Sequence, residues 1–200
     1  MKITDINQLH KFIEQFNFAT LVSHDNEELN VSHIPVILNR KQGTQGTLVW
    51  HVAKQNPHSR SFDGTKNALF IFHGPHAYIS PGWYKSSPSV PTWNYAVIRA
   101  YGNPTQVSNE QLASDLSQMV AQHEENSNYI IPDDYKLKLI DHIVGFSMEI
   151  MRIESTFKLG QNRSQEDRNG MLAGLQSNSA GSALAEFIQS IQKSQSNETK

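Results

Sequence analysis

The sequence predicts an α+β fold, mainly β, whose centre is a six-stranded antiparallel barrel with peripheral helices and a helical C-terminus. Short runs rich in β-branched residues follow one another from residue 18 to residue 102, separated by clusters of turn-forming residues. No long helix interrupts these runs, as the crossovers of a parallel sheet would. With 200 residues, of which 38% are hydrophobic, the chain can bury the core of one domain.

The first half of the chain predicts one short helix and then the six strands. Leu9, Phe12 and Phe16 recur at helical spacing, and Asp5 is a candidate N-cap with Gln8 three positions further on. The expected strands cover residues 18–24, 29–40, 46–53, 67–74, 76–81 and 94–102. Their number and order favour a barrel over a parallel α/β sheet.

The second half adds helices and one more strand. Helices predicted at residues 108–125 and 133–143 look like a single insertion, and residues 144–159 alternate like a strand that returns across the barrel. Two C-terminal helices are expected at residues 164–175 and 181–193. We therefore expect a barrel domain over residues 1–176, with the insertion at about 108–143, and a C-terminal helix with a polar tail over residues 177–200.

Composition excludes several classes of protein. The chain has no Cys, which removes disulfide frameworks, zinc–thiolate sites and thiol nucleophiles. No apolar run approaches the ~20 residues that cross a bilayer, and the N-terminus lacks the apolar centre of a signal peptide, so we expect no membrane contact and a cytoplasmic location. Lys and Arg number 17 against 19 Asp and Glu, a balance that argues against a general electrostatic hold on nucleic acid.

Aromatic residues are concentrated in residues 73–84, HGPHAYISPGWY, and residues 90–95, VPTWNY. Such a density indicates either a core or a platform for a flat ligand. Polar residues lie among the aromatics, and each would need a partner if buried, which favours a surface for a planar heterocycle. His73 and His76 could suggest a metal, but Gly74 and Pro75 prevent a shared helical face, so we expect no metal site.

A candidate anion site follows the strand at residues 46–53. Lys54 stands just before Asn56 and Pro57, a pair that favours a helix start because Asn caps it and Pro suits the first turn. Free backbone N–H groups, the helix dipole and an ammonium would then converge on a phosphate. The alternative is a surface lysine beside an ordinary capped helix.

A second candidate segment, KLGQNRSQEDR, joins the last strand to a helix that Ser164 would cap. Gln161 and Arg163 could present donors to a ligand. In the alternative interpretation, Arg163 and Arg168 pair with Glu166 and Asp167 at a solvated helix start.

Five motifs together resemble the PaiB family, also called FMN-binding negative transcriptional regulators. They are NVSHIPVIL, GTLVWHVAKQNP, GPHAYISPGWY, VPTWNYAVIRAYG and residues 143–175, and the likeness runs from about Phe18 to Leu175. The family is similar to the split barrels of pyridoxamine-phosphate oxidases and flavin reductases. This resemblance implies a six-stranded split β-barrel, a homodimer, and FMN in a groove at the subunit interface.

The resemblance also assigns candidate FMN-binding residues. It implies that Ser32 and His33 lie beside the flavin, and that Lys54 holds the phosphate with His51, Ala53 and Asn56 as neighbours. The second subunit would contribute the remaining candidates, which are Trp93, Asn94, Gln161 and Arg163. The chain has Lys54 where relatives commonly have Arg, and a lysine cannot bind a phosphate through two parallel hydrogen bonds as an arginine can. It has Gly160 and Gly82 where relatives commonly have Ser.

Three functions remain open at this stage. A regulator that lowers transcription is implied by the family, but no helix-turn-helix pattern or basic stripe is present, so any DNA contact should be weak or indirect. A flavin reductase or oxidase is the alternative, with NAD(P)H docking transiently because no GxGxxG segment occurs. A haem-binding barrel with His51 or His76 as axial ligand is the third. The apolar area of Trp83, Tyr84 and Trp93 predicts a dimer.

Overall fold

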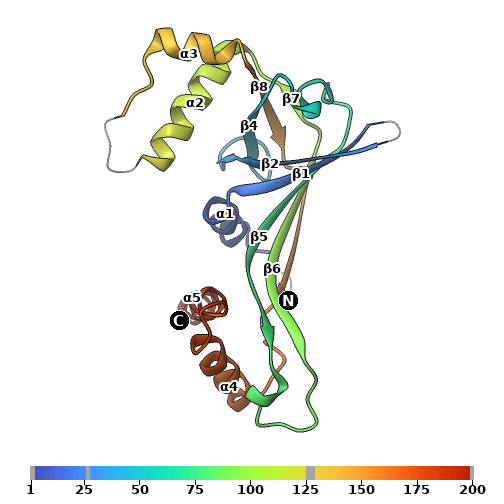
Figure 1. Ribbon diagram of the computed structural model, residues 1–200, viewed down its shortest axis with the longest axis vertical. Coiled ribbons are helices and arrows are strands. Elements are labelled where there is room, and N and C mark those ends of the chain that lie inside the picture. Colours follow the sequence, from blue (N-terminus) through green and yellow to red (C-terminus); the bar gives the residue numbers. More distant parts are fainter. Residues whose placement is uncertain (1–2, 26–27, 125–128, 199–200) are drawn as a thin grey trace. The chain divides into compact units, whose positions relative to one another are not determined.

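The computed structural model describes residues 3–25, 28–124 and 129–198. Within them the chain forms two antiparallel sheets flanked by helices (Figure 1). The five-stranded sheet has the order β2-β1-β5-β6-β9, and the four-stranded sheet has the order β3-β4-β8-β7. The strands are β1 Phe18–Asp25, β2 Glu28–Pro35, β3 Ile37–Asn39, β4 Thr47–Ala53, β5 Ala68–Ile79, β6 Thr92–Gly102, β7 Thr105–Gln106, β8 Ile143–Glu149 and β9 Arg152–Lys158.

The α+β class is confirmed, but the predicted count of six barrel strands is wrong, since the described residues contain nine strands. Two predicted strands are each divided. Residues 29–40 break after Pro35, which has no N–H for a sheet hydrogen bond, and Val36 N–H donates to the Asn17 carbonyl at 3.0 Å. The division lets the chain leave one sheet at β2 and enter the other at β3.

Residues 144–159 also divide where the chain passes from one sheet to the other. The amide of Ile150 donates to the Gly46 carbonyl, and the amide of Met151 donates to the Tyr101 carbonyl, both at 2.9 Å. These two bonds take the backbone out of the β8 ladder, and β9 then joins the five-stranded sheet. Alternation of residue types does not distinguish one long strand from two short ones that belong to different sheets.

Residues 67–74 and 76–81, predicted as two strands, are one strand, β5. Its buried positions are first Phe70 and Phe72 and later Ala77 and Ile79, so the alternation changes phase near Pro75. A proline cannot donate to a ladder, and such positions tolerate a local irregularity. The phase change explains why the sequence indicated two elements.

The first helix, α1 Ile6–Gln15, confirms the prediction from helical spacing. The Asp5 side chain accepts hydrogen bonds from the amides of Asn7 at 3.1 Å and Gln8 at 3.3 Å, as an N-cap does. Its apolar face, which includes Phe12 and Ile13, is buried.

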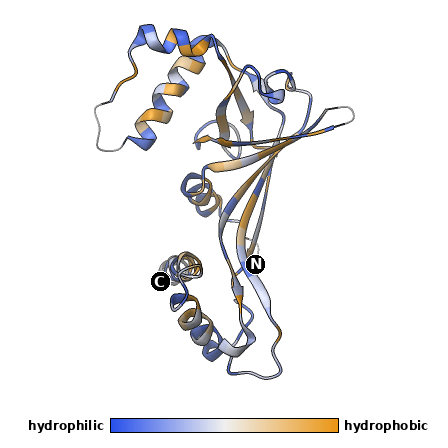
Figure 2. Cartoon of the chain, viewed as in Figure 1, coloured by the Kyte–Doolittle hydropathy of each residue, from blue (hydrophilic) through white to orange (hydrophobic). Residues whose placement is uncertain are grey.

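Helices α2 Asn109–His123 and α3 Asp133–Ile140 lie where the helical insertion was expected. Apolar residues recur along α2 between polar ones (Figure 2). Leu112 and Leu116 pack with Ile140 of α3 in a small apolar cluster. Gly145 of β8 allows close approach here, because a Cβ atom would lie 2.8 Å from Leu112 Cδ1. None of the described helices is long and apolar enough to span a membrane.

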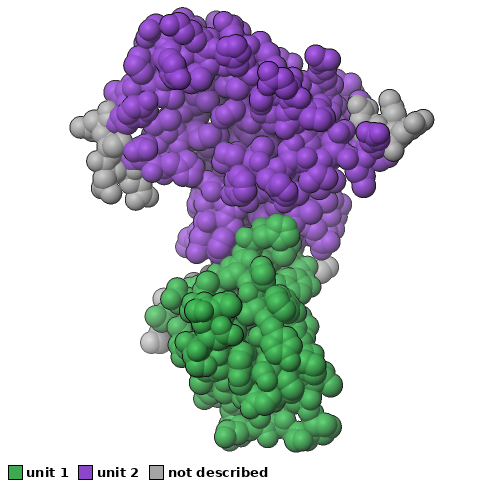
Figure 3. Space-filling model, in the orientation of Figure 1, with its two compact units in different colours: residues 1–4, 73–97, 155–200 green, residues 5–72, 98–154 purple. Residues whose placement is uncertain are grey.

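The chain divides into two compact units (Figure 3). Unit 1 comprises residues 1–4, 73–97 and 155–200, and unit 2 comprises residues 5–72 and 98–154. The core of unit 2 is aromatic. Trp50 of β4 lies with its ring centroid 4.8 Å from that of Phe70 and 5.8 Å from that of Phe146.

Unit 1 contains helices α4 Gln165–Gln176 and α5 Ser182–Glu198, which confirm the two predicted C-terminal helices. The 3₁₀ turn η2 Pro81–Trp83 packs on α4, where Gly170 and Gly174 make room for it. A Cβ atom on Gly174 would lie 2.2 Å from the Trp83 ring. Tyr84 is buried and Trp83 is half-buried, so of the three aromatics from which the dimer was predicted, Trp93 is the one that stays exposed.

Candidate functional site

The candidate phosphate-binding residue, Lys54, follows directly after β4. Its amide donates to the His142 carbonyl at 2.9 Å, and its carbonyl accepts a hydrogen bond from Ser59 Oγ at 2.8 Å. Both backbone groups of Lys54, its amide and its carbonyl, are therefore hydrogen-bonded. The side chains of Lys54 and of its neighbour Ala53 are exposed.

Asn56 caps the next turn as predicted. Its Oδ1 accepts a hydrogen bond from the His58 amide at 2.9 Å. The turn it caps, η1 Pro57–Arg60, is a 3₁₀ helix of four residues. One short turn has little macrodipole, so we expect most of any attraction for an anion to come from the side-chain charges of Lys54 and Arg60.

Ser32 and Asn56, two of the predicted site residues, contact each other and a buried histidine that the sequence did not single out. Asn56 Nδ2 donates to Ser32 Oγ at 3.0 Å, and Ser32 Oγ lies 2.8 Å from His58 Nδ1. His58 is fully buried and stacks on Phe62 with ring centroids 5.4 Å apart. Burial lowers the pKa of His58, and the nearby Asn30 carbonyl opposes this effect in part.

The two histidines that were predicted, His33 and His51, point elsewhere. His33 follows Ser32 in β2 and therefore faces the opposite side of the strand, where Thr20 Oγ1 lies 3.1 Å from its Nδ1. His51 pairs with Gly145 across β4 and β8, so its side chain shares the sheet face on which Leu112 packs. Burial there lowers the pKa of His51.

Trp93, the first of the predicted residues in unit 1, forms an exposed aromatic group with His76 and Tyr78. Its Nε1 donates to His76 Nδ1 at 3.3 Å, and its ring lies edge-on to that of Tyr78 with centroids 6.4 Å apart. Trp93 and Tyr78 are each 49% exposed. This part of the aromatic segment has the character of a platform for a flat ligand, while Tyr84 is buried and Trp83 is half-buried against α4.

Asn94 and Gln161 have internal partners. Asn94 is 1% exposed, and its Nδ2 lies 3.3 Å from Met171 Sδ. Gln161 uses both ends of its amide on its own loop, accepting from the Leu159 amide at 2.8 Å and donating to the Phe157 carbonyl at 2.9 Å. These two side chains therefore shape the loop between β9 and α4.

Gly160, one of the departures from the resembled family motif, is required by its backbone conformation. Its φ is +77°, in the left-handed region, and a Cβ atom would lie 2.9 Å from Met171 Sδ. A side chain here would be strained both by the backbone and by this contact. The departure from the family motif thus fits the packing of this chain.

Asp167 does not pair at a solvated helix start, as one interpretation of the sequence had it. It is 2% exposed and accepts hydrogen bonds from the amides of Lys85 at 2.8 Å and Ser86 at 3.0 Å and from Ser86 Oγ at 2.6 Å. The bond from the Ser86 hydroxyl is the main cause of a lowered pKa for Asp167, with the Arg163 charge adding to it. The bonds attach α4 to the loop before β6.

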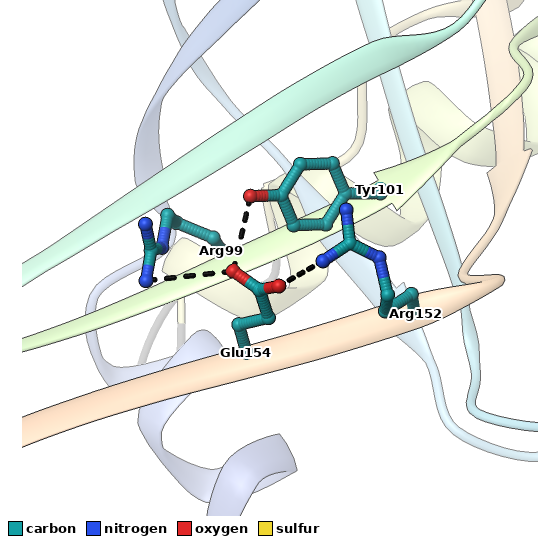
Figure 4. Close-up of polar contacts among 4 residues, drawn as sticks. All are labelled: Arg99, Tyr101, Arg152 and Glu154. Carbon is teal, nitrogen blue, oxygen red and sulfur yellow. Dashed lines mark hydrogen bonds and ion pairs between the residues drawn. The ribbon is translucent and has the colours of Figure 1, made fainter. Parts of the chain in front are cut away.

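A charged cluster on β6 and β9 was also missed by the sequence analysis (Figure 4). Glu154 accepts a hydrogen bond from the Tyr101 hydroxyl at 3.2 Å, lies 3.4 Å from Arg99 Nη2, and pairs with Arg152. The guanidinium of Arg152 lies 3.7 Å from the Tyr101 ring centroid. These side chains are partly exposed, so their ion pairs contribute little to stability and mainly hold the two strands in register.

The two antiparallel sheets have the strand arrangement of a split barrel. The exposed lysine after β4 and the exposed aromatic group of unit 1 are separate candidate contacts for a flavin. Residues 1–152 match the family described as "Putative FMN-binding domain", and the chain belongs to this family. FMN is the cofactor of the family. The predicted cofactor is thereby confirmed, and the predicted PaiB resemblance is confirmed by the relative from Bacillus subtilis described next.

Individual relatives agree with this assignment. The chain is 31% identical over 201 residues to Protease synthase and sporulation protein PAI 2 of Bacillus subtilis, covering 97% of this chain and 96% of that protein. The structure of an FAD and heme binding protein from Mycobacterium smegmatis matches with a TM-score of 0.61 at 12% identity, covering 78% and 73% of the two chains. The flavocytochrome Anf3 from Azotobacter vinelandii matches with a TM-score of 0.58 at 12% identity, covering 78% and 68%. Both structures support the fold.

Asp167→Asn should make the stability of the protein less dependent on pH in acid. The pKa of Asp167 is lowered in the folded protein, so its carboxylate stabilises the fold fully above the ordinary aspartate pKa of about 3.9. This stabilisation is lost as the pH falls through the pKa that Asp167 has in the folded protein. Urea unfolding at pH values from 7 to 3 should show that wild type and variant differ in their free energy of unfolding, and that this difference becomes smaller in acid. Glu166→Gln on the exposed side of the same turn is the control, and a difference that stayed constant with pH would contradict this role.

Proposed function

We propose that this protein is a PaiB-type regulator in which FMN binds with its phosphate at Lys54. The observation that carries the proposal is an exposed ammonium on a fixed backbone, beside a capped turn held by the bonds among Ser32, Asn56 and His58. A pre-positioned cation loses little freedom when an anion binds. Arg60, at the end of the turn, is exposed and adds a second positive charge.

The flavin ring would lie in a groove completed by a second copy of the chain. In this arrangement the exposed Trp93 of that copy contacts the flavin, while Asn94 and Gln161 hold the loop between β9 and α4 that carries Arg163. FMN supplies the electron-transfer chemistry when bound, and the residues of this chain bind and orient it. Ser32 acts on the phosphate end through Asn56, and the exposed Ala53 directly precedes Lys54, whereas His33 lies on the other face of β2.

An apolar strand face supports the dimer. Leu29 and Val31 of β2 lie on one face of the β1–β2 pair and are 69% and 57% exposed. Phe18 of β1 lies on the same face and is 67% exposed. Exposed apolar side chains on one strand face are typical of a protein interface, although Thr20 and His33 lie between Val31 and Phe18 on this face.

Lys54→Ala should weaken FMN binding by about 10- to 150-fold and leave riboflavin binding unchanged, because riboflavin has no phosphate and a hydrogen bond to a charged group contributes about 1.5 to 3 kcal/mol. Flavin fluorescence titrations measure both affinities. Lys11→Ala, at an exposed lysine of α1, is the control and should change neither. An equal loss for both ligands would show that Lys54 acts on the fold or the ring site, and absence of FMN binding by the wild type would overturn the proposal itself.

The protein should sediment as a dimer at micromolar concentration, and Val31→Lys should shift it toward the monomer by placing a charge on the apolar face of β2. Sedimentation velocity measures the masses directly. Ser114→Lys, on the exposed side of α2, adds the same charge elsewhere and should leave the dimer intact. A wild-type monomer in the presence of FMN rules out the interface.

The regulatory role should operate through a partner or through weak DNA contact, since the net charge of −2 provides no strong attraction for phosphates. A DNA titration of the FMN-loaded protein at several salt concentrations should show weak binding that salt abolishes. Tight, sequence-selective binding at physiological salt is the result that would refute this expectation.

A further inference from the structure

A hollow in unit 1 lies beside the loop that leads from β9 to α4. Its volume is about 200 Å³, and it is lined by residues of this loop, of the start of β6 and of the loop before it. Lys158 and Arg163 are positively charged, and among the described residues that line the hollow none is acidic. We call it the Lys158–Arg163 pocket.

Arg163 is held in place without a carboxylate partner among the described residues. Its guanidinium lies 4.2 Å from the ring centroid of the buried Tyr84, and its amide donates to the Gly160 carbonyl at 3.0 Å. Stacking on a ring leaves the N–H groups at the edge of a guanidinium free to donate. Asp167, whose pKa responds to Arg163, uses both carboxylate oxygens on Lys85 and Ser86.

Lys158 supplies the second charge. Its Nζ donates to Thr92 Oγ1, a neutral partner that fixes the ammonium without cancelling its charge. Two cations with no acidic residue on the same walls create a positive potential, and a concave site concentrates it. Such a pocket attracts an anion.

We propose that the Lys158–Arg163 pocket binds a small anionic ligand through a phosphate or carboxylate group, at a site separate from the FMN phosphate. The planar fork of Arg163 suits two oxygens of such a group, and Lys158 supplies a point charge. The volume is below the roughly 300 to 1,000 Å³ of pockets that enclose drug-sized ligands. It therefore fits a compact anion better than a flavin ring.

The anionic group has two sources, a free small molecule or the phosphate of FMN. The proposal commits to the free molecule and does not depend on flavin binding, so it is tested on flavin-free protein. Inorganic phosphate and, separately, succinate are titrated into the full chain while amide resonances are followed by NMR. The amides of Gly160 and Arg163 should shift with at least one of the two probes.

Lys158→Gln and Arg163→Gln should each weaken that binding by about tenfold or more, since each removes a charge-assisted hydrogen bond. Lys158 is exposed, so its variant should fold normally even if the Arg163 variant does not. Lys193→Gln, at an exposed lysine of α5 in the same unit, is the control and should bind as the wild type does. Lys54→Ala should also leave binding at this pocket unchanged.

Two results would overturn the proposal. The first is the absence of shifts at Gly160 and Arg163 with both probes, or shifts that neither Lys158→Gln nor Arg163→Gln reduces. The second is a loss of FMN affinity in Lys158→Gln with riboflavin unaffected, together with competition between FMN and phosphate. That outcome would assign the pocket to the FMN phosphate, and Lys54→Ala would then leave FMN affinity unchanged.

Discussion

The bond between Ser32 and the buried His58 is the constraint on which the geometry of the candidate FMN end of unit 2 depends. An imidazole without a partner is costly to bury, so β2 and the turn after β4 must stay close enough for their side chains to meet at 2.8 Å. His58 in turn stacks on Phe62, which contacts the Trp50 and Phe146 rings of the core. The position of the exposed Lys54 is thereby coupled to the buried aromatic core of unit 2.

In unit 1 a buried carboxylate joins segments that are far apart in the chain. Asp167 holds the loop at residues 85–86 against the first turn of α4, and the glycines of that helix admit Trp83. Both contacts bring α4 close to the segment between β5 and β6. The loop that follows β9 is fixed independently by the Gln161 amide, so the two walls of the Lys158–Arg163 pocket are each anchored before any ligand arrives.

Features with a local cause could be predicted from the sequence. Asp5 and Asn56 were identified as caps because a cap acts on amides two or three positions away. The four helices of the second half were indicated by the helical spacing of their apolar residues, and the family was indicated by long motifs.

The predicted number of strands was not exact because the change of sheet at Pro35 and at Ile150 depends on hydrogen bonds to Asn17 and Gly46, which are far away in the sequence. The contact between Ser86 and Asp167 spans 81 residues, and His58 looked like one of nine histidines. Contacts between residues that are far apart in the chain produce no periodic pattern of residue types in the sequence.

The distribution of the three tryptophans has a spectroscopic consequence. Trp50 is almost completely enclosed in the aromatic core of unit 2, Trp83 rests against α4 in unit 1, and Trp93 is half exposed beside His76. Indole emission depends on the polarity around the ring, so each tryptophan reports on a different environment. Replacing them with phenylalanine one at a time would assign the emission of the protein to its parts, and each unit would then have its own intrinsic probe of unfolding.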